Sequence, residues 1–132
     1  MNIYTGYYAR TNEYKKHGLA PISISWKVPD KWLSDENKWY KSLAPKYDIW
    51  REYNTIHNEE IYVSRFTNEV LSKLEPSKVL SDLKVLSGDK DPILICYEKP
   101  ECFCHRHIVG VWLYESLGIP VNEYYVSTKF EF

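Results

Sequence analysis

The sequence predicts an α/β fold built on a mostly parallel sheet, and three consecutive stretches carry this prediction. Residues 92–98, PILICYE, form a continuous apolar run, which is typical of a strand buried on both faces. Apolar residues then recur with a helical period over 105–117, and IPVNEYYV, residues 119–126, has the composition of a strand. A strand, a helix and a strand in this order form a βαβ unit, whose two strands are parallel.

The first half of the chain predicts two strands and two short helices. Residues 2–9 and 20–26 are rich in β-branched and aromatic types and are bounded by turn formers, so both predict strands. Short helical segments are expected near 34–43 and 46–53. Tyr, Trp and Phe make up 16% of the sequence, and their flat rings suit either half-buried packing or stacking on bases.

Two further helices are expected before the buried strand. Asn58 is a good N-cap, and apolar residues recur at helical spacing as far as Leu74, so the first helix is predicted over 58–74. The second helix begins at Pro76, whose missing N–H costs nothing in a first turn, and it ends at Gly88. Together the two helices predict an αα-hairpin.

Length, composition and charge limit the possible classes of protein. A chain of 132 residues can bury one core, so residues 1–132 are expected to form one domain. Seventeen basic and eighteen acidic side chains give a net charge of -1, which does not favour binding to a membrane or to nucleic acid, although local contact with nucleic acid stays open. The N-terminus lacks a signal-peptide pattern, and no apolar run reaches the roughly 20 residues of a membrane helix, so we expect a cytoplasmic protein.

One stretch, CYEKPECFCHRH at residues 96–107, concentrates the reactive side chains. It holds all three cysteines, two of the four histidines, two glutamates and an arginine. Because it follows the buried strand and opens the next helix, it lies where parallel sheets bind ligands. The helix N-terminus and Arg106 predict a site for a small anionic or nucleotide-like ligand. Glu98 is then placed to act as a general acid or base, or to accept a ribose hydroxyl.

The three cysteines lie too close together for a framework of disulfides, so they are expected to be reduced thiols or ligands. Cys96 belongs to the apolar run and is expected in the core. Cys104 precedes His105 at a helix N-terminus, where thiolate pKa values fall, so it is either a reactive residue or a structural one. Cys102, Cys104, His105 and His107 are of the types that zinc prefers, but positions 105 and 107 diverge by about 200° around a helix. No metal and no cofactor is therefore predicted.

The same stretch resembles the signature of the family called domain of unknown function 488 (DUF488). The resemblance rests on ILICYEKPECFCHRH, in which Cys-x-Glu ends a strand and Cys-His-Arg opens a helix, and on IYTGYYAR and PSKVLSDL. It implies a single-domain, Rossmann-like three-layer sandwich. The second strand departs from the commoner members of the family, which carry Asp and Arg where this chain reads SISWK.

Two functions are compatible with these residues. If the first two strands are parallel to the central one, five more residues are expected at the same rim: Tyr7, Arg10, Ser25, Trp26 and Lys27. The first hypothesis is an enzyme acting on a nucleotide or a nucleic-acid-derived substrate, with Glu98 and His105 as catalytic residues and Arg106 and Cys104 in contact with the ligand. The alternative is a non-catalytic module that binds a nucleotide-like ligand or a protein partner.

Overall fold

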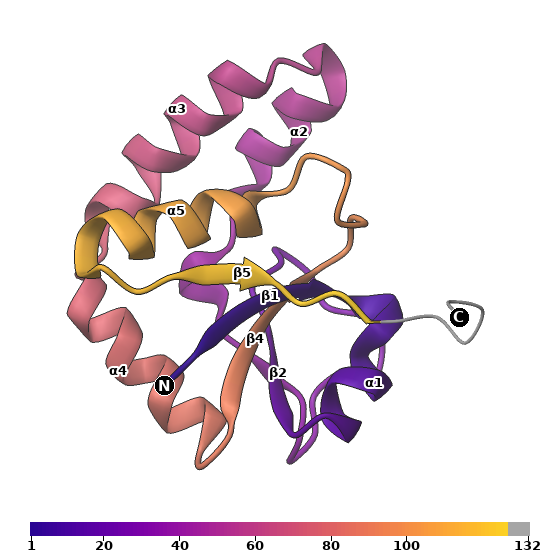
Figure 1. Cartoon of the computed structure of the whole chain (residues 1–132). Helices are drawn as coiled ribbons and strands as arrows, with labels where there is room; N and C mark the ends of the chain where they lie inside the picture. The colour runs from indigo at the N-terminus through magenta and orange to yellow at the C-terminus, as the bar shows by residue number, and fades with distance from the viewer. Residues whose placement is uncertain (127–132) are drawn as a thin grey trace.

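The computed structural model describes residues 1–126, which form a five-stranded sheet with helices on both faces (Figure 1). The strands lie in the order β3-β2-β4-β1-β5, and each pair of neighbours in this sheet is parallel. Their bounds are Ile3–Tyr7 (β1), Leu19–Ser23 (β2), Lys38–Trp39 (β3), Asp91–Cys96 (β4) and Val121–Glu123 (β5).

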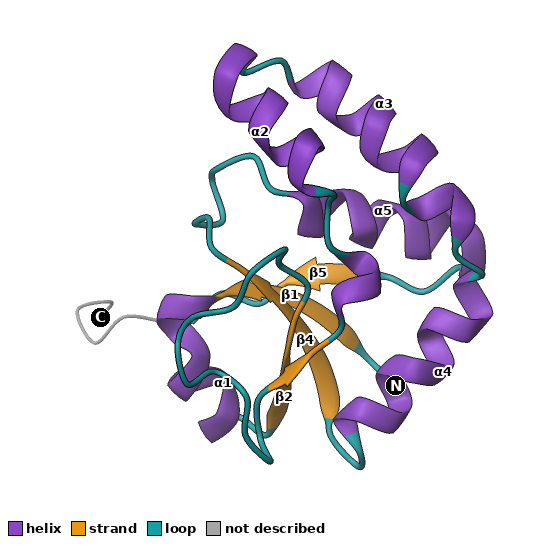
Figure 2. Cartoon of the chain, turned by 180° about the vertical axis from the view of Figure 1, so that it is seen from behind, coloured by secondary structure: helices purple, strands orange, loops and turns teal. Residues whose placement is uncertain are grey.

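The α-helices within these residues are Thr11–Lys16 (α1), Tyr47–Ile56 (α2), Glu59–Glu69 (α3), Pro76–Ser87 (α4) and His105–Leu117 (α5). Helices α2 to α5 lie on one face of the sheet, while α1 and the loop that follows β2 lie on the other (Figures 1 and 2). Two apolar clusters fill the two spaces between these layers. The predicted α/β fold, a Rossmann-like three-layer sandwich with a mostly parallel sheet, is therefore confirmed.

Strand β4 is buried on both faces, as its apolar run predicts. Leu94 packs into the cluster beneath α2 to α5, whereas Ile93 and Ile95 pack on the other face with Tyr14 of α1. All three strand residues are fully buried. Because β4 lies between β2 and β1, its carboxyl end at Cys96 is at the middle of the sheet edge.

Helix termini follow the local signals in the sequence. The Asn58 side chain accepts a hydrogen bond from the backbone N–H of Ile61 at 3.1 Å and caps α3. Pro76 is the first residue of α4, and Gly118, with φ of 71°, ends α5 in the left-handed region that favours glycine. The predicted helix over 58–74 is shorter than expected, because a 3₁₀ turn replaces its last residues.

The expectations for part of the first half are wrong. Residues 34–43 do not form a helix: Lys38–Trp39 extends the sheet, and a 3₁₀ turn follows at Lys41–Leu43. Pairing with the end of β2 holds this segment extended. Helix α1 was not predicted at all, although Tyr14 within it is completely buried. Its six residues are too few to display a helical period.

The topology places a crevice at the carboxyl edge of the sheet. The chain leaves β2 at Ser23 into the loop on the α1 face, whereas it leaves β4 at Cys96 toward α5 on the opposite face (Figure 2). Adjacent parallel strands whose connections leave toward opposite faces open a crevice between their carboxyl ends, where α/β proteins bind ligands. Among residues 1–126, no helix is long and apolar enough to cross a membrane.

Candidate functional site

A pocket of about 790 Å³ opens at the carboxyl ends of β2 and β4. Four segments line it: the residues that follow β2, helix α2 with Pro45 just before it, Tyr62 of α3, and the chain from the end of β4 to the start of α5. The lining residues are Ser25, Trp26, Lys27, Pro45, Tyr47, Trp50, Tyr53, Asn54, Tyr62, Cys96, Tyr97, Glu98, Cys102, Phe103, Cys104 and His105. The pocket therefore occupies the crevice that the topology creates.

Aromatic rings form two walls of this pocket. Tyr47 lies between Trp26 and Trp50, with ring centroids 6.1 and 5.9 Å away, and all three rings are partly exposed. Deeper in the pocket, Phe103 lies 5.0 Å from Tyr53 and 5.1 Å from the buried Tyr62. These partly exposed flat surfaces suit a planar apolar ligand, since aromatic rings stack on such groups.

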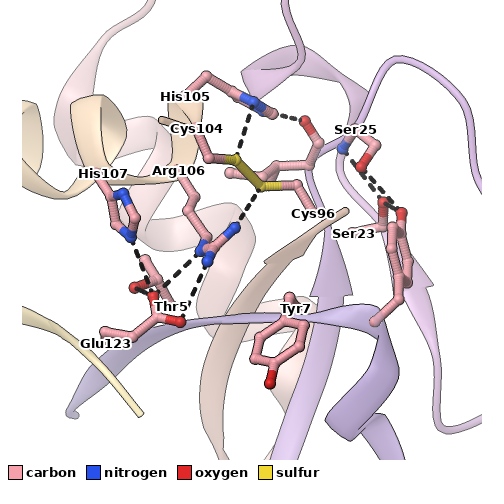
Figure 3. The surroundings of a disulfide bond; sticks show 12 residues. Thr5, Tyr7, Ser23, Ser25, Cys96, Cys104, His105, Arg106, His107 and Glu123 are labelled. Carbon is pink, nitrogen blue, oxygen red and sulfur yellow. Dashed lines mark hydrogen bonds and ion pairs between the residues drawn. A yellow bond between two sulfur atoms is a disulfide. The ribbon is translucent and has the colours of Figure 1, made fainter. Parts of the chain in front are cut away.

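Cys96 and Cys104 are joined by a disulfide beside the N-terminus of α5 (Figure 3). This corrects the expectation that the cysteines are reduced thiols or ligands, which holds only for Cys102, a free and exposed thiol. Cys96 is the last residue of β4 and Cys104 is the N-cap of α5. The intervening loop returns the chain to the strand end, and this brings the two buried sulfurs together.

His105 is buried, and its two ring nitrogens face the backbone oxygen of Ile24 and the Cys104 sulfur. Its Nε2 lies 2.6 Å from the backbone oxygen of Ile24, which can only accept, so Nε2 carries the proton. Nδ1 therefore presents its lone pair, 3.9 Å from the Cys104 sulfur. Burial lowers the pKa of His105 to about 4, and the nearby Arg106 cation adds to this effect. The imidazole is consequently neutral near pH 7.

Arg106 is completely buried, and its donors point toward Glu123 and the Cys96 sulfur (Figure 3). Its Nε and a terminal nitrogen lie 3.1 and 3.2 Å from the two carboxylate oxygens of Glu123, and its other terminal nitrogen lies 3.2 Å from the Cys96 sulfur. Glu123 also accepts from Thr5 at 2.6 Å and lies 3.2 Å from His107. Arg106 was predicted from the sequence to bind an anionic ligand, and in the structure its guanidinium forms a buried ion pair with Glu123.

Burial would raise the pKa of Glu123, but hydrogen bonds from His107, Arg106 and Thr5 outweigh it and lower the pKa below its ordinary value. The carboxylate is thus held in its charged form. Glu123 was not identified from the sequence, although a glutamate inside a short apolar strand is a signal for a buried partner.

Glu98 has the opposite setting. It is exposed, it lines the pocket, and it makes no hydrogen bond or ion pair with the residues that the structure describes. Burial raises the pKa of Tyr62 well above its ordinary value, and the charge of Glu98 adds to this effect. The carboxylate therefore faces the pocket without a partner among residues 1–126.

The remaining predicted site residues divide by strand. Ser25, Trp26 and Lys27, which follow β2, all line the pocket as expected. Tyr7, the last residue of β1, and Arg10, which follows it, do not line the pocket, and the ring of Tyr7 points away from the disulfide (Figure 3). Strand β4 separates β1 from β2 in the sheet, so the β1 end lies beyond the crevice.

Sequence reasoning missed the aromatic side chains of α2. Tyr47, Trp50 and Tyr53 recur at intervals of three residues and therefore share one side of the helix, which faces the pocket. This spacing is visible in the sequence. What it cannot show is that α2 lies over the end of β4, because the two elements are about 40 residues apart in the chain.

Comparison with known families matches residues 10–117 to DUF488-N3a, described as the active DUF488-N3 subclade. No curated protein and no solved structure gave a significant match. The matched span contains the stretch from Cys96 to Arg106, on which the resemblance in the sequence rests. Since the match covers most of the chain, this protein belongs to the DUF488 family.

Proposed function

We propose that this protein binds a nucleotide-like ligand in the pocket between the ends of β2 and β4. The observation that carries the proposal is the combination of aromatic walls with two unlike charged groups, Lys27 and Glu98, in a crevice at the carboxyl edge of a parallel sheet. A base or a similar planar ring stacks among Trp26, Tyr47 and Trp50. Each base stacked on an aromatic side chain contributes about 1–3 kcal/mol.

The charged groups supply the polar part of recognition. Lys27 is exposed on the pocket wall and offers a cation to a phosphate. Lys41 adds positive charge near the same wall, since its Nζ lies 4.4 Å from the ring centre of Trp26. Glu98 is free to accept hydrogen bonds from ligand hydroxyls, which makes a ribose a suitable partner. A nucleotide combines these three chemical features.

If the ligand is turned over, Glu98 is the residue suited to move the proton. It is a carboxylate in the pocket without a protein partner among the described residues. His105 is neutral near pH 7 and faces a sulfur, and Arg106 is paired with Glu123, so both are engaged by groups of the protein itself. Because His105 and Arg106 are engaged in this way, Glu98 is left without a second catalytic group, and this favours a second candidate function, a module that binds the ligand and leaves it unchanged.

Binding is tested by titrating the purified protein with adenosine, guanosine, their mono- and diphosphates, and inorganic phosphate. Trp26 and Trp50 line the pocket, so their fluorescence reports occupancy directly. We expect a nucleotide to bind more tightly than phosphate alone. Chromatography of the ligand after hours of incubation separates an enzyme from a binding module, because only an enzyme yields a product.

Matched variants locate the site. Trp50→Ala should weaken nucleotide binding by about 5- to 100-fold, as expected for the loss of one stacked ring. Tyr114→Ala removes an exposed aromatic ring of α5 outside this pocket and should leave affinity unchanged. Lys27→Ala should weaken nucleotides more than nucleosides, whereas Lys16→Ala, an exposed lysine of α1, should affect neither. Equal affinities for the parent and Trp50→Ala would refute the proposal.

A further inference from the structure

We propose that Cys96 and Cys104, in their reduced form, bind one Zn²⁺ or a similar thiophilic dication together with His105. One ligand atom from each residue, the two sulfurs and a ring nitrogen, lies within 4.8 Å of the others. All three side chains are buried. Reduced thiols and a neutral imidazole gathered in this way form a ready set of soft and borderline donors.

The composition of this set is that of an open zinc site. Two thiolates and one imidazole supply three ligands, with Zn–S and Zn–N distances of about 2.3 and 2.0 Å. Structural zinc sites close the fourth position with a protein ligand, whereas catalytic sites leave it to water or substrate. Cys96, Cys104 and His105 all line the nucleotide pocket, so the fourth position faces that pocket.

The tautomer of His105 is already suited to metal binding. Its Nε2–H donates to the backbone oxygen of Ile24 at 2.6 Å, and this leaves the lone pair of Nδ1 directed to the Cys104 sulfur. Histidine ligands ordinarily bind a metal through one nitrogen while the other donates to a carbonyl or carboxylate, which fixes the ring. Burial also keeps the imidazole neutral near pH 7, the form that can act as a ligand.

The charges around the three ligands also balance. Two thiolates neutralise the dication, and the adjacent Arg106 and Glu123 neutralise each other. A terminal nitrogen of Arg106 lies 3.2 Å from the Cys96 sulfur and can donate to it. Such a hydrogen bond favours the thiolate form, the form that binds metal. The buried group therefore carries no net charge when the ion is present.

The disulfide and the metal exclude each other. A dithiol reductant gives two electrons and two protons to the Cys96–Cys104 bond and becomes a disulfide itself, which leaves two cysteine thiols. Each thiol then releases one proton when it binds the ion. In a reducing compartment the pair exists as thiols, and oxidation would expel the ion.

This site differs from the set of Cys102, Cys104, His105 and His107, whose spacing in the sequence is unsuitable for zinc. Cys102 is exposed, and His107 lies against Glu123, so neither reaches the three buried donors. Cys96 takes their place from the end of β4. A local pattern in the sequence does not reveal this contribution, because seven loop residues lie between Cys96 and Cys104.

The test uses the full chain and the metal alone, without any nucleotide. The protein is reduced with a dithiol under nitrogen, freed of reductant, incubated with excess Zn²⁺ and dialysed before elemental analysis. We expect about one equivalent of zinc. Titration with Co²⁺ in place of Zn²⁺ should give intense thiolate charge-transfer absorption and the visible bands of a tetrahedral ion.

Three variants make the assignment specific. Cys104→Ala and His105→Gln should each bind Zn²⁺ at least about 100-fold more weakly in competition with a chelating dye, while circular dichroism checks that they remain folded. The glutamine keeps a donor for the Ile24 oxygen. Cys102→Ala removes a free thiol of the same loop and should retain one equivalent.

Two results would overturn the proposal. One is a folded, fully reduced parent protein that retains less than about a tenth of an equivalent of zinc and shows no Co²⁺ spectrum, which would make the pair a disulfide only. The other is equal loss of zinc in Cys102→Ala and Cys104→Ala, which would point to scattered thiol binding. Neither readout depends on nucleotide binding, so the proposed function stands or falls separately.

Discussion

Glu98 and Glu123 both lie close to the β4–α5 connection, yet the protein holds them in opposite ways. The Glu123 side chain is 7% exposed and contacts Thr5, Arg106 and His107. Glu98 is exposed at the pocket and has no partner among the described residues. A carboxylate whose hydrogen-bonding capacity is met by the protein stabilises the fold, whereas one that is left free is available to a ligand. The difference separates the buried, structural side of this region from the side that faces the pocket.

Removing Arg106 should have the largest effect on stability. Arg106→Ala leaves the Glu123 carboxylate without its main cationic partner in a buried position, and breaking such a pair costs about 3–5 kcal/mol. Urea denaturation followed by circular dichroism measures the loss. Arg10→Ala, which breaks a partly exposed pair with Glu13, should change stability by less than about 1 kcal/mol.

The paired variant Arg106→Leu with Glu123→Leu sharpens this prediction. It removes both charges, so it should be more stable than Arg106→Ala alone. If Arg106→Ala costs less than about 1 kcal/mol, the ion pair does not hold this side of the fold together.

The buried His105 should make stability depend on pH. Its pKa is about 4 in the folded protein against 6.5 ordinarily, so between these values the unfolded chain binds more protons than the folded one. The contribution of the neutral His105 to the free energy of unfolding is therefore fully present above pH 6.5. It is lost as the pH falls toward 4, which lowers the free energy of unfolding by about 3 kcal/mol. Arg106 and His107, the nearby cationic or protonatable groups, act in the same direction.

The measurement compares urea denaturation of the parent and of His105→Gln at several pH values. Groups that titrate in both proteins cancel in the difference. We expect the two curves to converge as the pH falls from 6.5 to 4. Parallel curves would show that His105 is protonated alike in the folded and unfolded chains.

A tight contact on β1 should produce the next effect. A Cβ added to Gly6 would lie 2.6 Å from the hydroxyl oxygen of the buried Tyr14, and the phenol cannot move freely there. Gly6→Ala should cost about 1–3 kcal/mol through this overpacking. At Gly110 of α5 the nearest atom, in Val121, is 3.3 Å away, so Gly110→Ala should cost less, since alanine also favours the helix. Thermal denaturation of both variants checks the order.

The two glutamates also show which features of the fold and the site could be predicted from the sequence and which could not. The βαβ unit of β4, α5 and β5 was predictable because each element carries its own local pattern, a buried run or a helical period. The role of Arg106 was not, because its partner Glu123 comes from the next strand, 17 residues later. An arginine at a helix N-terminus suggests an anionic ligand until the structure supplies an internal carboxylate.

Part of the candidate site was also predictable from local patterns in the sequence. Glu98 and the residues Ser25, Trp26 and Lys27 lie at the carboxyl ends of the predicted strands 92–98 and 20–26, and parallel strands place these ends on one edge of the sheet. The aromatic wall from α2 depends on packing across the sheet face, and the contact of Cys96 with Cys104 depends on the path of the loop. Neither is encoded in a local pattern.

Glu98→Gln should have the smallest effect on stability and the clearest effect on function. The substitution keeps the size of an exposed side chain that has no protein partner among the described residues, so the free energy of unfolding should change by less than about 0.5 kcal/mol. Glutamine retains one carbonyl oxygen as an acceptor but cannot take up a proton. If the protein is an enzyme, turnover should therefore fall by about 100-fold or more while nucleotide affinity changes little. Glu123→Gln is the matched control and should instead lower the denaturation midpoint, because the Glu123 carboxylate pairs with Arg106.

One outcome would contradict this prediction. If Glu98→Gln reduces stability as much as Glu123→Gln and leaves ligand binding and turnover unaffected, the two glutamates share a structural role. Glu98 would then not be the catalytic base of the pocket.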